Sequence, residues 1–151
     1  MCVKVTAQNK GSGIIRARDF QDVDGMITDV PGVVLATFYA DCVPLYFVDP
    51  VNRAIGLSHS GWRGTVGKIG RETVEAMGRE YGTRAQDLTV AIGPSICRQC
   101  YEVSEDVIRQ FQRNFSQGAV AGAVRFQRKR KVSVGSLEGE PVYSGGGRGP
   151  A

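Results

Sequence analysis

The sequence predicts a single domain that combines β-strands with α-helices. Its 151 residues are enough for one hydrophobic core, and 42% hydrophobic with 23% charged residues is ordinary for a globular protein. Short runs rich in β-branched and aromatic residues alternate with two stretches in which apolar residues recur at helical spacing. These observations favour one domain of mixed α and β structure.

Strands are expected mainly in the first two thirds of the chain. The runs that predict them are residues 3–6, 33–39, 43–48, 54–59 and 88–92. A turn at residues 49–52 would join the third and fourth runs into a hairpin. The end of the fourth run would then return to the start of the third. Cys42 and His59 would therefore be spatial neighbours.

Two amphipathic helices are expected after these strands. Apolar residues recur at helical spacing from Val66 to Met77, and Gly82 is typical of a residue that ends a helix. A second helical pattern runs from Val103 to Phe115, with Ser104 in position to cap it.

The folded domain is expected to cover residues 1–115, and the Gly/Arg-rich tail of residues 116–151 is expected to be poorly ordered apart from a short strand at residues 132–134. The tail has six Lys or Arg and two Asp or Glu, so it holds the whole net charge of +4. No aromatic residue interleaves its basic run at residues 128–131. A nucleic-acid partner is therefore not expected.

No segment is expected to enter a membrane. The longest apolar run, residues 33–48, is interrupted by Asp41 and Pro44, and the N-terminus lacks the apolar stretch of a signal peptide. Four cysteines without a secretory signal fit a reducing compartment. We therefore expect a cytoplasmic protein. No oligomeric state is predicted.

The chemistry is expected at Cys42 and at His59, the only histidine. A cysteine and a histidine at the ends of adjacent strands can be a nucleophile with its base, or two ligands of a soft metal such as zinc or copper. Arg63, flanked by glycines, suits a phosphate or carboxylate. The structural alternatives are a buried thiol, a histidine satisfied in a turn and a surface arginine, and the residues alone leave both interpretations open.

Cys97 and Cys100 form a CxxC motif. A structural zinc site would need a second cysteine pair at suitable spacing, and a thioredoxin-like motif would open a helix directly after a strand. The sequence meets neither condition, so a structural role is favoured.

Several ordered motifs between about Val3 and Phe115 resemble a known family. They are Ala40-Asp41-Cys42-Val43-Pro44, His59-Ser60-Gly61-Trp62-Arg63-Gly64, Gly93-Pro94-Ser95-Ile96 and Tyr101-Glu102-Val103. With the Cys-to-His spacing, they resemble the YfiH/YlmD-type laccase-domain proteins, also called multicopper polyphenol oxidase family proteins. The resemblance implies an α/β (α+β) fold of mixed β-sheets covered by helices, here an incomplete αββα sandwich.

The resemblance also implies a mononuclear metal site, usually zinc, built from two histidines and one cysteine. By matching motif, Cys42 and His59 are two of its ligands, and Arg63 lies in the motif that walls the site. The implied activity is phosphorolysis of a purine nucleoside such as adenosine, inosine or methylthioadenosine, with adenosine deamination as a further activity. Copper-dependent polyphenol oxidation is an alternative, although a multicopper mechanism requires many histidines.

The family's first metal-binding histidine belongs to a Gln-x-His segment that would precede Met1, so we expect two of the three ligands here. Cys2 lies near that place and could complete a Cys2, Cys42 and His59 set. Three interpretations stay open. The chain is an active zinc phosphorylase, an inactive fragment that lacks the first histidine, or a cysteine hydrolase with Cys42 as nucleophile and His59 as base.

Overall fold

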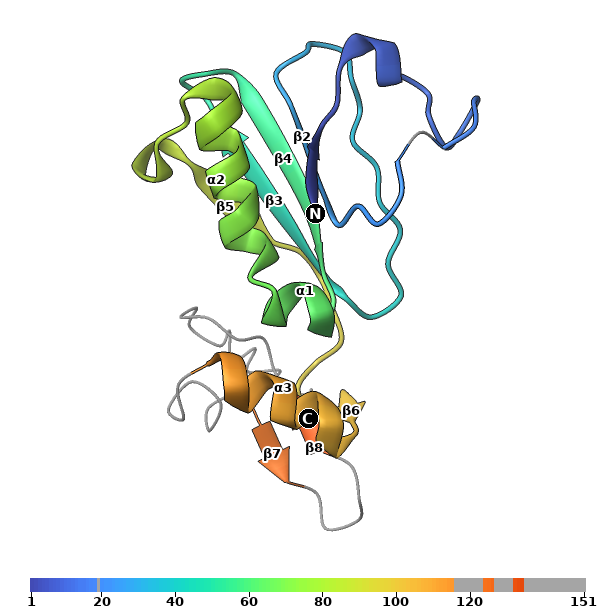
Figure 1. Cartoon of the computed structure of the whole chain (residues 1–151), viewed down its shortest axis with the longest axis vertical. Helices are drawn as coiled ribbons and strands as arrows, with labels where there is room; N and C mark the ends of the chain where they lie inside the picture. The colour runs from blue at the N-terminus through green and yellow to red at the C-terminus, as the bar shows by residue number, and fades with distance from the viewer. Residues whose placement is uncertain (19, 116–123, 127–131, 135–151) are drawn as a thin grey trace, which may run out of the picture.

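The chain folds into a five-stranded sheet with helices on one side and a second, three-stranded sheet (Figure 1). The computed structural model describes residues 1–18, 20–115, 124–126 and 132–134. The strands are β1 (Cys2–Lys4), β2 (Gly25–Thr28), β3 (Val43–Asp49), β4 (Ala54–Ser60), β5 (Thr89–Ile92), β6 (Glu102–Val103), β7 (Val124–Phe126) and β8 (Val132–Val134). The helices are α1 (Trp62–Val66), α2 (Ile69–Tyr81) and α3 (Glu105–Asn114), with single 3-10 turns at Ala7–Asn9 and Ala85–Asp87.

The larger sheet has the strand order β1-β2-β4-β3-β5. β1 and β2 are parallel, and the other neighbouring strands are antiparallel. The predicted hairpin is confirmed, because β3 pairs with β4 and Val43 lies opposite Ser60 at its open end. Asp49 closes the turn at the other end, where its carboxylate accepts the backbone N–H groups of Val51 and Asn52, each at 2.9 Å.

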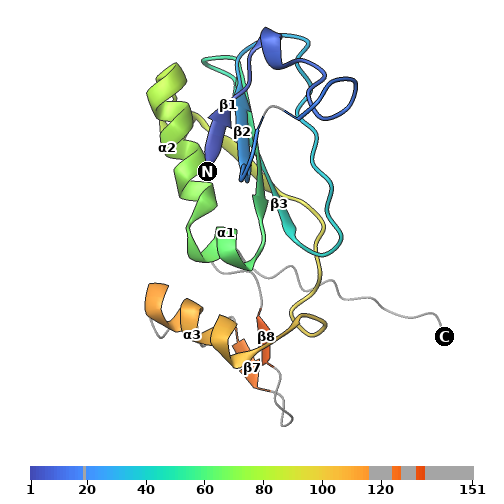
Figure 2. The same ribbon diagram turned by 45° about the vertical axis from the view of Figure 1, so that its right-hand side comes forward.

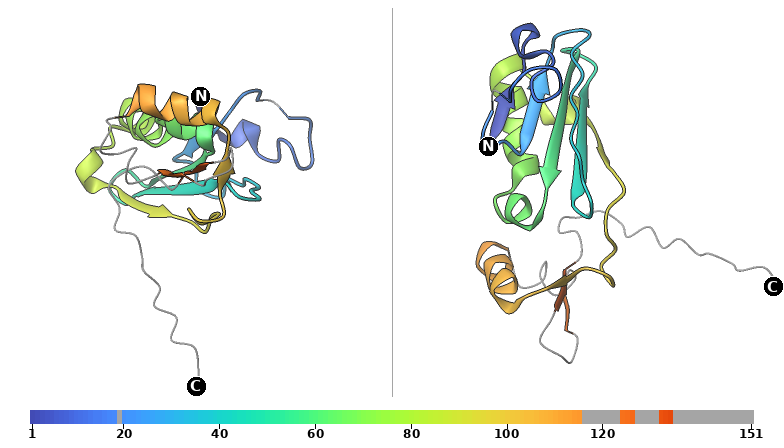
Figure 3. Two further views of the ribbon diagram at one scale, coloured as in Figure 1. Left: turned by 90° about the horizontal axis from the view of Figure 1, so that it is seen from below. Right: turned by 90° about the vertical axis from the view of Figure 1, so that its right-hand side faces the viewer.

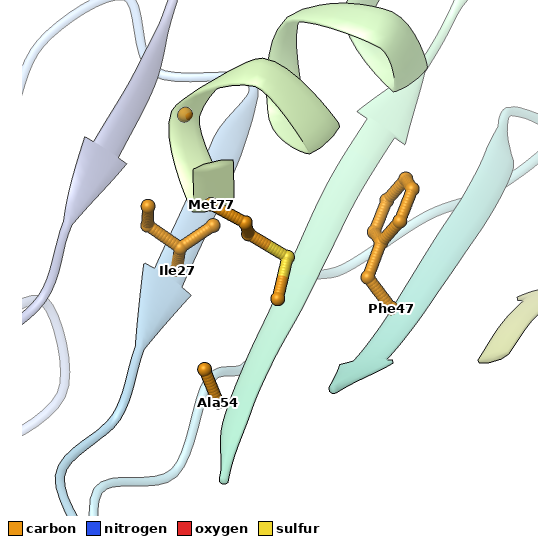
Figure 4. Close-up of a cluster of buried hydrophobic side chains, with 5 residues drawn as sticks. Ile27, Phe47, Ala54 and Met77 are labelled. Carbon is orange, nitrogen blue, oxygen red and sulfur yellow. The ribbon is translucent and has the colours of Figure 1, made fainter. Parts of the chain in front are cut away.

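α2 covers one face of this sheet, and a hydrophobic core lies beneath it (Figure 2). Met77 points from α2 toward the sheet, between Ile27 of β2 and Phe47 of β3 (Figure 4). Its side chain is fully buried. The helix ends before Gly82, whose φ of 73° is readily adopted by glycine alone, so the predicted stop is confirmed.

The helical pattern that begins at Val66 is divided in the structure. α1 ends at Val66 and α2 begins at Ile69, because Lys68 adopts a left-handed conformation with φ of 55°. The helical spacing of apolar residues does not predict the break between α1 and α2.

The strand predicted at residues 33–39 is wrong. The segment is extended and alternate side chains turn inward, so that Val33 is buried while Val34 and Phe38 are 84% and 89% exposed. It belongs to no strand ladder, because none of the pairings of the larger sheet includes it. The segment instead follows the side of the sheet opposite α2 (Figure 2).

The smaller sheet has the order β6-β8-β7 and lies beside α3, beyond the end of the larger sheet (Figure 3). α3 packs against α1 through a second hydrophobic cluster, which joins Val107, Ile108 and Phe111 to Trp62 and Val66. Ser104 occupies the predicted N-cap position of α3, but its side chain makes no capping hydrogen bond to the helix.

The mixed sheets and their covering helices confirm the α/β (α+β) fold class. β8 coincides with the short strand expected at residues 132–134. The rest of the tail that was predicted to be poorly ordered lies outside the described residues, except for β7. Among the residues that the structure describes, no helix has the length and apolar content needed to cross a membrane.

Candidate metal-binding and active site

Cys42 and His59 lie side by side at the open end of the β3–β4 hairpin. Cys42 directly precedes β3, and His59 pairs with Pro44 near the end of β4. The Sγ atom of Cys42 and the Nε2 atom of His59 lie 3.2 and 3.4 Å from the point that a Cβ would take at Gly61. The predicted proximity of the cysteine and the histidine is therefore confirmed.

Gly61 leaves free the space between these two donor atoms. Its backbone conformation, φ of −72° and ψ of 178°, is open to any residue. Glycine therefore matters here for space, because a methyl group would lie tightly against Cys42 Sγ at 3.2 Å and in contact with the His59 ring at 3.4 Å. The chain then turns directly into α1.

Asp24 orients the His59 ring. Its carbonyl oxygen accepts the backbone N–H of His59 at 2.7 Å, and its Oδ1 atom lies 3.4 Å from His59 Nδ1. If Nδ1 carries the proton that Asp24 accepts, the lone pair of Nε2 faces Cys42, as in a metal-ligating histidine supported by a carboxylate. Asp24 lies 35 residues from His59 in the chain. Asp24 is not among the predicted site residues, because no sequence pattern predicts β2, the strand that brings Asp24 beside the end of β4.

The Tyr39 ring packs against the His59 ring. Its ring centroid lies 5.4 Å from that of His59, with the ring planes tilted by 42°. Its hydroxyl donates to the Ser58 carbonyl at 3.4 Å and accepts a hydrogen bond from the Thr37 hydroxyl at 2.6 Å. The segment predicted as a strand therefore supplies a side chain to the wall of the site.

The Cys42 thiol lies in surroundings that keep it protonated. Burial raises its pKa, and the negative charge of Asp41 raises it further. In the described part of the chain, Cys42 Sγ has no hydrogen bond to His59. A cysteine hydrolase requires a thiolate activated by an adjacent base, and the structure shows no such contact.

Arg63 borders a small cavity next to the histidine. Its guanidinium lies 4.4 Å from the centroid of the Trp62 ring, and its side chain is exposed. The cavity has a volume of about 190 Å³ and is lined by Met1, Asp24, Arg63, Gly64, Gly67, Ile69 and Glu72. Asp24 thus links the cavity to His59, and Arg63 is a cation available to an anion bound there.

Cys2 does not join Cys42 and His59, which corrects the suggestion that it completes their ligand set. Its Sγ atom and Ser58 Oγ each lie 3.1 Å from the point that a Cβ would take at Gly25, and Cys2 packs against the core beneath α2. Burial is the main cause that raises the pKa of its thiol. The described residues contain no group of three or more His, Cys, Asp or Glu side chains that could hold a metal.

The donor atoms of Cys42 and His59 are of types that bind metals. Thiolate sulfur and imidazole nitrogen are the ligands that zinc uses most often in proteins, and zinc requires at least three protein ligands at a catalytic site. Cys42 and His59 can supply one ligand of each kind. These two side chains thus offer the donor types of an N/S metal site, with the Asp24 carboxylate beside the imidazole.

Comparison with known proteins agrees with this geometry. A sequence model for the family described as "Multi-copper polyphenol oxidoreductase laccase" matches residues 2–138. The chain is 47% identical over 97 residues, 64% of its length, to a protein named purine nucleoside phosphorylase from Deinococcus radiodurans. It is 42% identical over 109 residues, 70% of its length, to purine nucleoside phosphorylase YlmD from Bacillus subtilis. A third relative, 41% identical over 93 residues or 62% of the chain, is named adenosine deaminase RL5 and comes from an unknown prokaryotic organism.

Solved structures share the fold. The crystal structure of YfiH, a hypothetical protein of Bacillus licheniformis, superposes with a TM-score of 0.79 and 32% sequence identity over 89% of this chain and 51% of that one. The chain spans 38% of the length of the first two curated relatives and 35% of the third. These matches confirm the YfiH/YlmD resemblance, and the chain belongs to the multi-copper polyphenol oxidoreductase laccase family.

Proposed function

We propose that this chain carries part of the catalytic centre of a zinc-dependent purine nucleoside phosphorylase. The observation that supports the proposal most is the convergence of Cys42 Sγ and His59 Nε2 on the space beside Gly61. The printed names of two relatives supply the reaction class, a phosphorolysis of purine nucleosides. The same names favour zinc over copper, since phosphorolysis is not a redox reaction and zinc has no redox chemistry.

Cys42 and His59 would hold the metal. When bound there, zinc would act as a Lewis acid on an oxygen of substrate or phosphate. Asp24 would accept the Nδ1 proton of His59 and so keep Nε2 free to bind the metal.

Arg63 would bind the phosphate. Its guanidinium offers a planar fork of N–H donors, and the Trp62 ring beneath it limits the orientations of that fork. In phosphorolysis a phosphate oxygen attacks the anomeric carbon of the ribose, the bond to the purine nitrogen breaks, and the base leaves with a proton. Phosphate is proposed to bind at the Arg63 edge of the cavity, away from the carboxylates of Asp24 and Glu72 that also line it.

The proposed substrates are adenosine, inosine and methylthioadenosine. Adenosine deamination is a second candidate activity, favoured by the name of the relative adenosine deaminase RL5. The cytoplasm is the proposed location, because all four cysteines are free thiols of the kind that a reducing compartment preserves.

The test is to purify the full chain, measure its zinc and copper content, and follow release of base from adenosine and inosine with and without phosphate. We expect bound zinc and release of base that depends on phosphate. Cys42→Ala and His59→Ala should lose both, whereas Cys2→Ser should keep both. Release of ammonia without phosphate would assign the deaminase activity instead.

Other outcomes would overturn the proposal. A chain that folds but has neither metal nor activity would be an inactive fragment of the family. A metal-free chain whose hydrolase activity disappears when Cys42 is alkylated is a cysteine hydrolase. Stoichiometric copper with oxidation of phenols would restore the activity that the family description names.

A further inference from the structure

Cys97 and Cys100 form a second chemical group, separate from the candidate metal site. Both side chains are exposed, and the Cys97 and Cys100 sulfur atoms lie 2.9 Å apart. The carbonyl oxygen of Cys97 accepts the N–H groups of Cys100 at 3.0 Å and Tyr101 at 3.1 Å, which forms the turn between them. Exposed side chains contribute little to a core, so the structural role favoured from the sequence does not describe this pair.

The turn holds the two sulfur atoms close to the distance of a disulfide bond. An S–S bond is about 2.05 Å long, so the sulfur atoms need to approach by less than about 1 Å. The segment before the turn is anchored, because Gly93 donates its N–H to the Pro44 carbonyl at 2.9 Å and Ile96 donates to the Asp41 carbonyl at 3.0 Å. The pair can therefore close with little movement of the surrounding chain.

The two thiols differ in acidity. The hydrogen bond between the two sulfur atoms lowers the pKa of Cys97 and raises the pKa of Cys100. Burial raises the pKa of both remaining cysteines, Cys2 and Cys42. Cys97 is therefore the cysteine that most readily becomes a thiolate, the reactive form.

We propose that Cys97 and Cys100 are a modification site, a dithiol that hydrogen peroxide oxidises to a disulfide. The Cys97 thiolate attacks one peroxide oxygen, an S–O bond forms, the O–O bond breaks, and the departing hydroxide takes up a proton to become water. The Cys100 thiolate then attacks the sulfenic acid sulfur of Cys97. An S–S bond forms, the S–O bond breaks, and the second hydroxide leaves as water after protonation. The two thiols lose two electrons and two protons, and peroxide is reduced to two water molecules.

The test treats the full chain with hydrogen peroxide, blocks the remaining thiols with an alkylating reagent, and digests the product with trypsin without reduction. Arg98 lies between the two cysteines, so trypsin separates them. We expect peptides 85–98 and 99–109 to remain joined and to separate when a reductant is added. The intact protein should lose the mass of two hydrogen atoms.

Two variants assign the roles. Cys100→Ser should stop at the sulfenic acid, which dimedone traps at Cys97, and Cys97→Ser should react with peroxide at least about tenfold more slowly. A Cys2→Ser, Cys42→Ser double variant, which keeps only the pair, should form the disulfide as the wild type does. The proposal fails if peroxide links Cys42 to either member of the pair, if Cys97 goes directly to a sulfinic acid, or if Cys97→Ser reacts as fast as the wild type. None of these results depends on zinc or on phosphorolysis, so the test is independent of the proposed function.

Discussion

Asp24 holds His59 through two contacts, one from its backbone and one from its side chain. The carbonyl oxygen of Asp24 accepts the backbone N–H of His59 at 2.7 Å, and its Oδ1 atom lies 3.4 Å from His59 Nδ1. The first contact fixes the backbone of the histidine beside Asp24, and the second engages Nδ1, so that Nε2 stays free of the carboxylate. The orientation of the proposed metal ligand therefore depends on a residue that precedes β2.

Replacing Asp24 with alanine should weaken zinc binding about 10- to 100-fold, the usual cost of losing the carboxylate that supports a metal-ligating histidine. Competition with a chelator measures the zinc affinity. Asp29→Ala is the matched control, because it removes an exposed carboxylate from the same part of the chain. Equal zinc affinities in the two variants would contradict the role assigned to Asp24.

Replacing Gly61 with alanine should lower zinc affinity at least about tenfold, because metal ligands tolerate only small displacements and the new methyl group would lie only 3.2 Å from Cys42 Sγ. Gly61 is also the N-cap residue of α1, so unfolding should become easier by about 1 kcal/mol. Gly70→Ala in α2 is the control. Its methyl group would meet only a flexible end of Leu45 at 3.3 Å, and zinc binding should not change. Zinc binding by Gly61→Ala that matches this control would show that the space is not needed.

The proximity of Cys42 and His59 could be predicted from the sequence, because it depends on local signals. A turn between two apolar runs fixes a hairpin, and a hairpin fixes which residues lie opposite each other. Asp24 could not be reached in this way, since its place depends on the pairing of β2 with a strand about 30 residues later.

The wrong strand prediction at residues 33–39 has a different cause. Alternating burial in this segment is real, but periodicity reports only that one side of an extended segment is covered. It does not report whether the segment pairs with a strand, and none of the pairings of the larger sheet includes residues 33–39. The pattern therefore predicts the extended conformation of residues 33–39 correctly, but it does not predict that they stay outside the sheet.

Replacing Met77 with alanine should destabilise the fold by about 2–5 kcal/mol, because the side chain is fully buried and its loss leaves a cavity between α2 and the sheet. Urea unfolding followed by circular dichroism measures the free energy. Val51→Ala, at an exposed position of the β3–β4 turn, is the control and should stay within about 0.5 kcal/mol of the wild type. Similar losses in the two variants would mean that the cluster beneath α2 is not the main core.

Asp49 makes stability depend on pH in the acid range. Its side chain is 1% exposed. Hydrogen bonds lower its pKa from 3.8 to about 2, the largest contribution coming from the Asn52 side chain, with further ones from the Thr83 side chain and the backbone N–H groups of Asn52 and Val51. The pKa in the folded state is therefore below that of the unfolded chain. It follows that Asp49 contributes its full stabilisation above about pH 4 and loses it as the pH falls toward about 2.

The measurement is the urea midpoint of wild type and Asp49→Asn at several pH values from about 6 to about 2. The wild type should be more stable at the upper end, and the difference should shrink below about pH 4, because protonation removes the charge that the variant already lacks. Asp29→Asn, at an exposed position, controls for the loss of a negative charge. A difference between wild type and Asp49→Asn that stays constant over the whole range would mean that the carboxylate has no special role in the turn. In that case the hairpin that places Cys42 beside His59 would owe its stability to strand pairing and core packing alone.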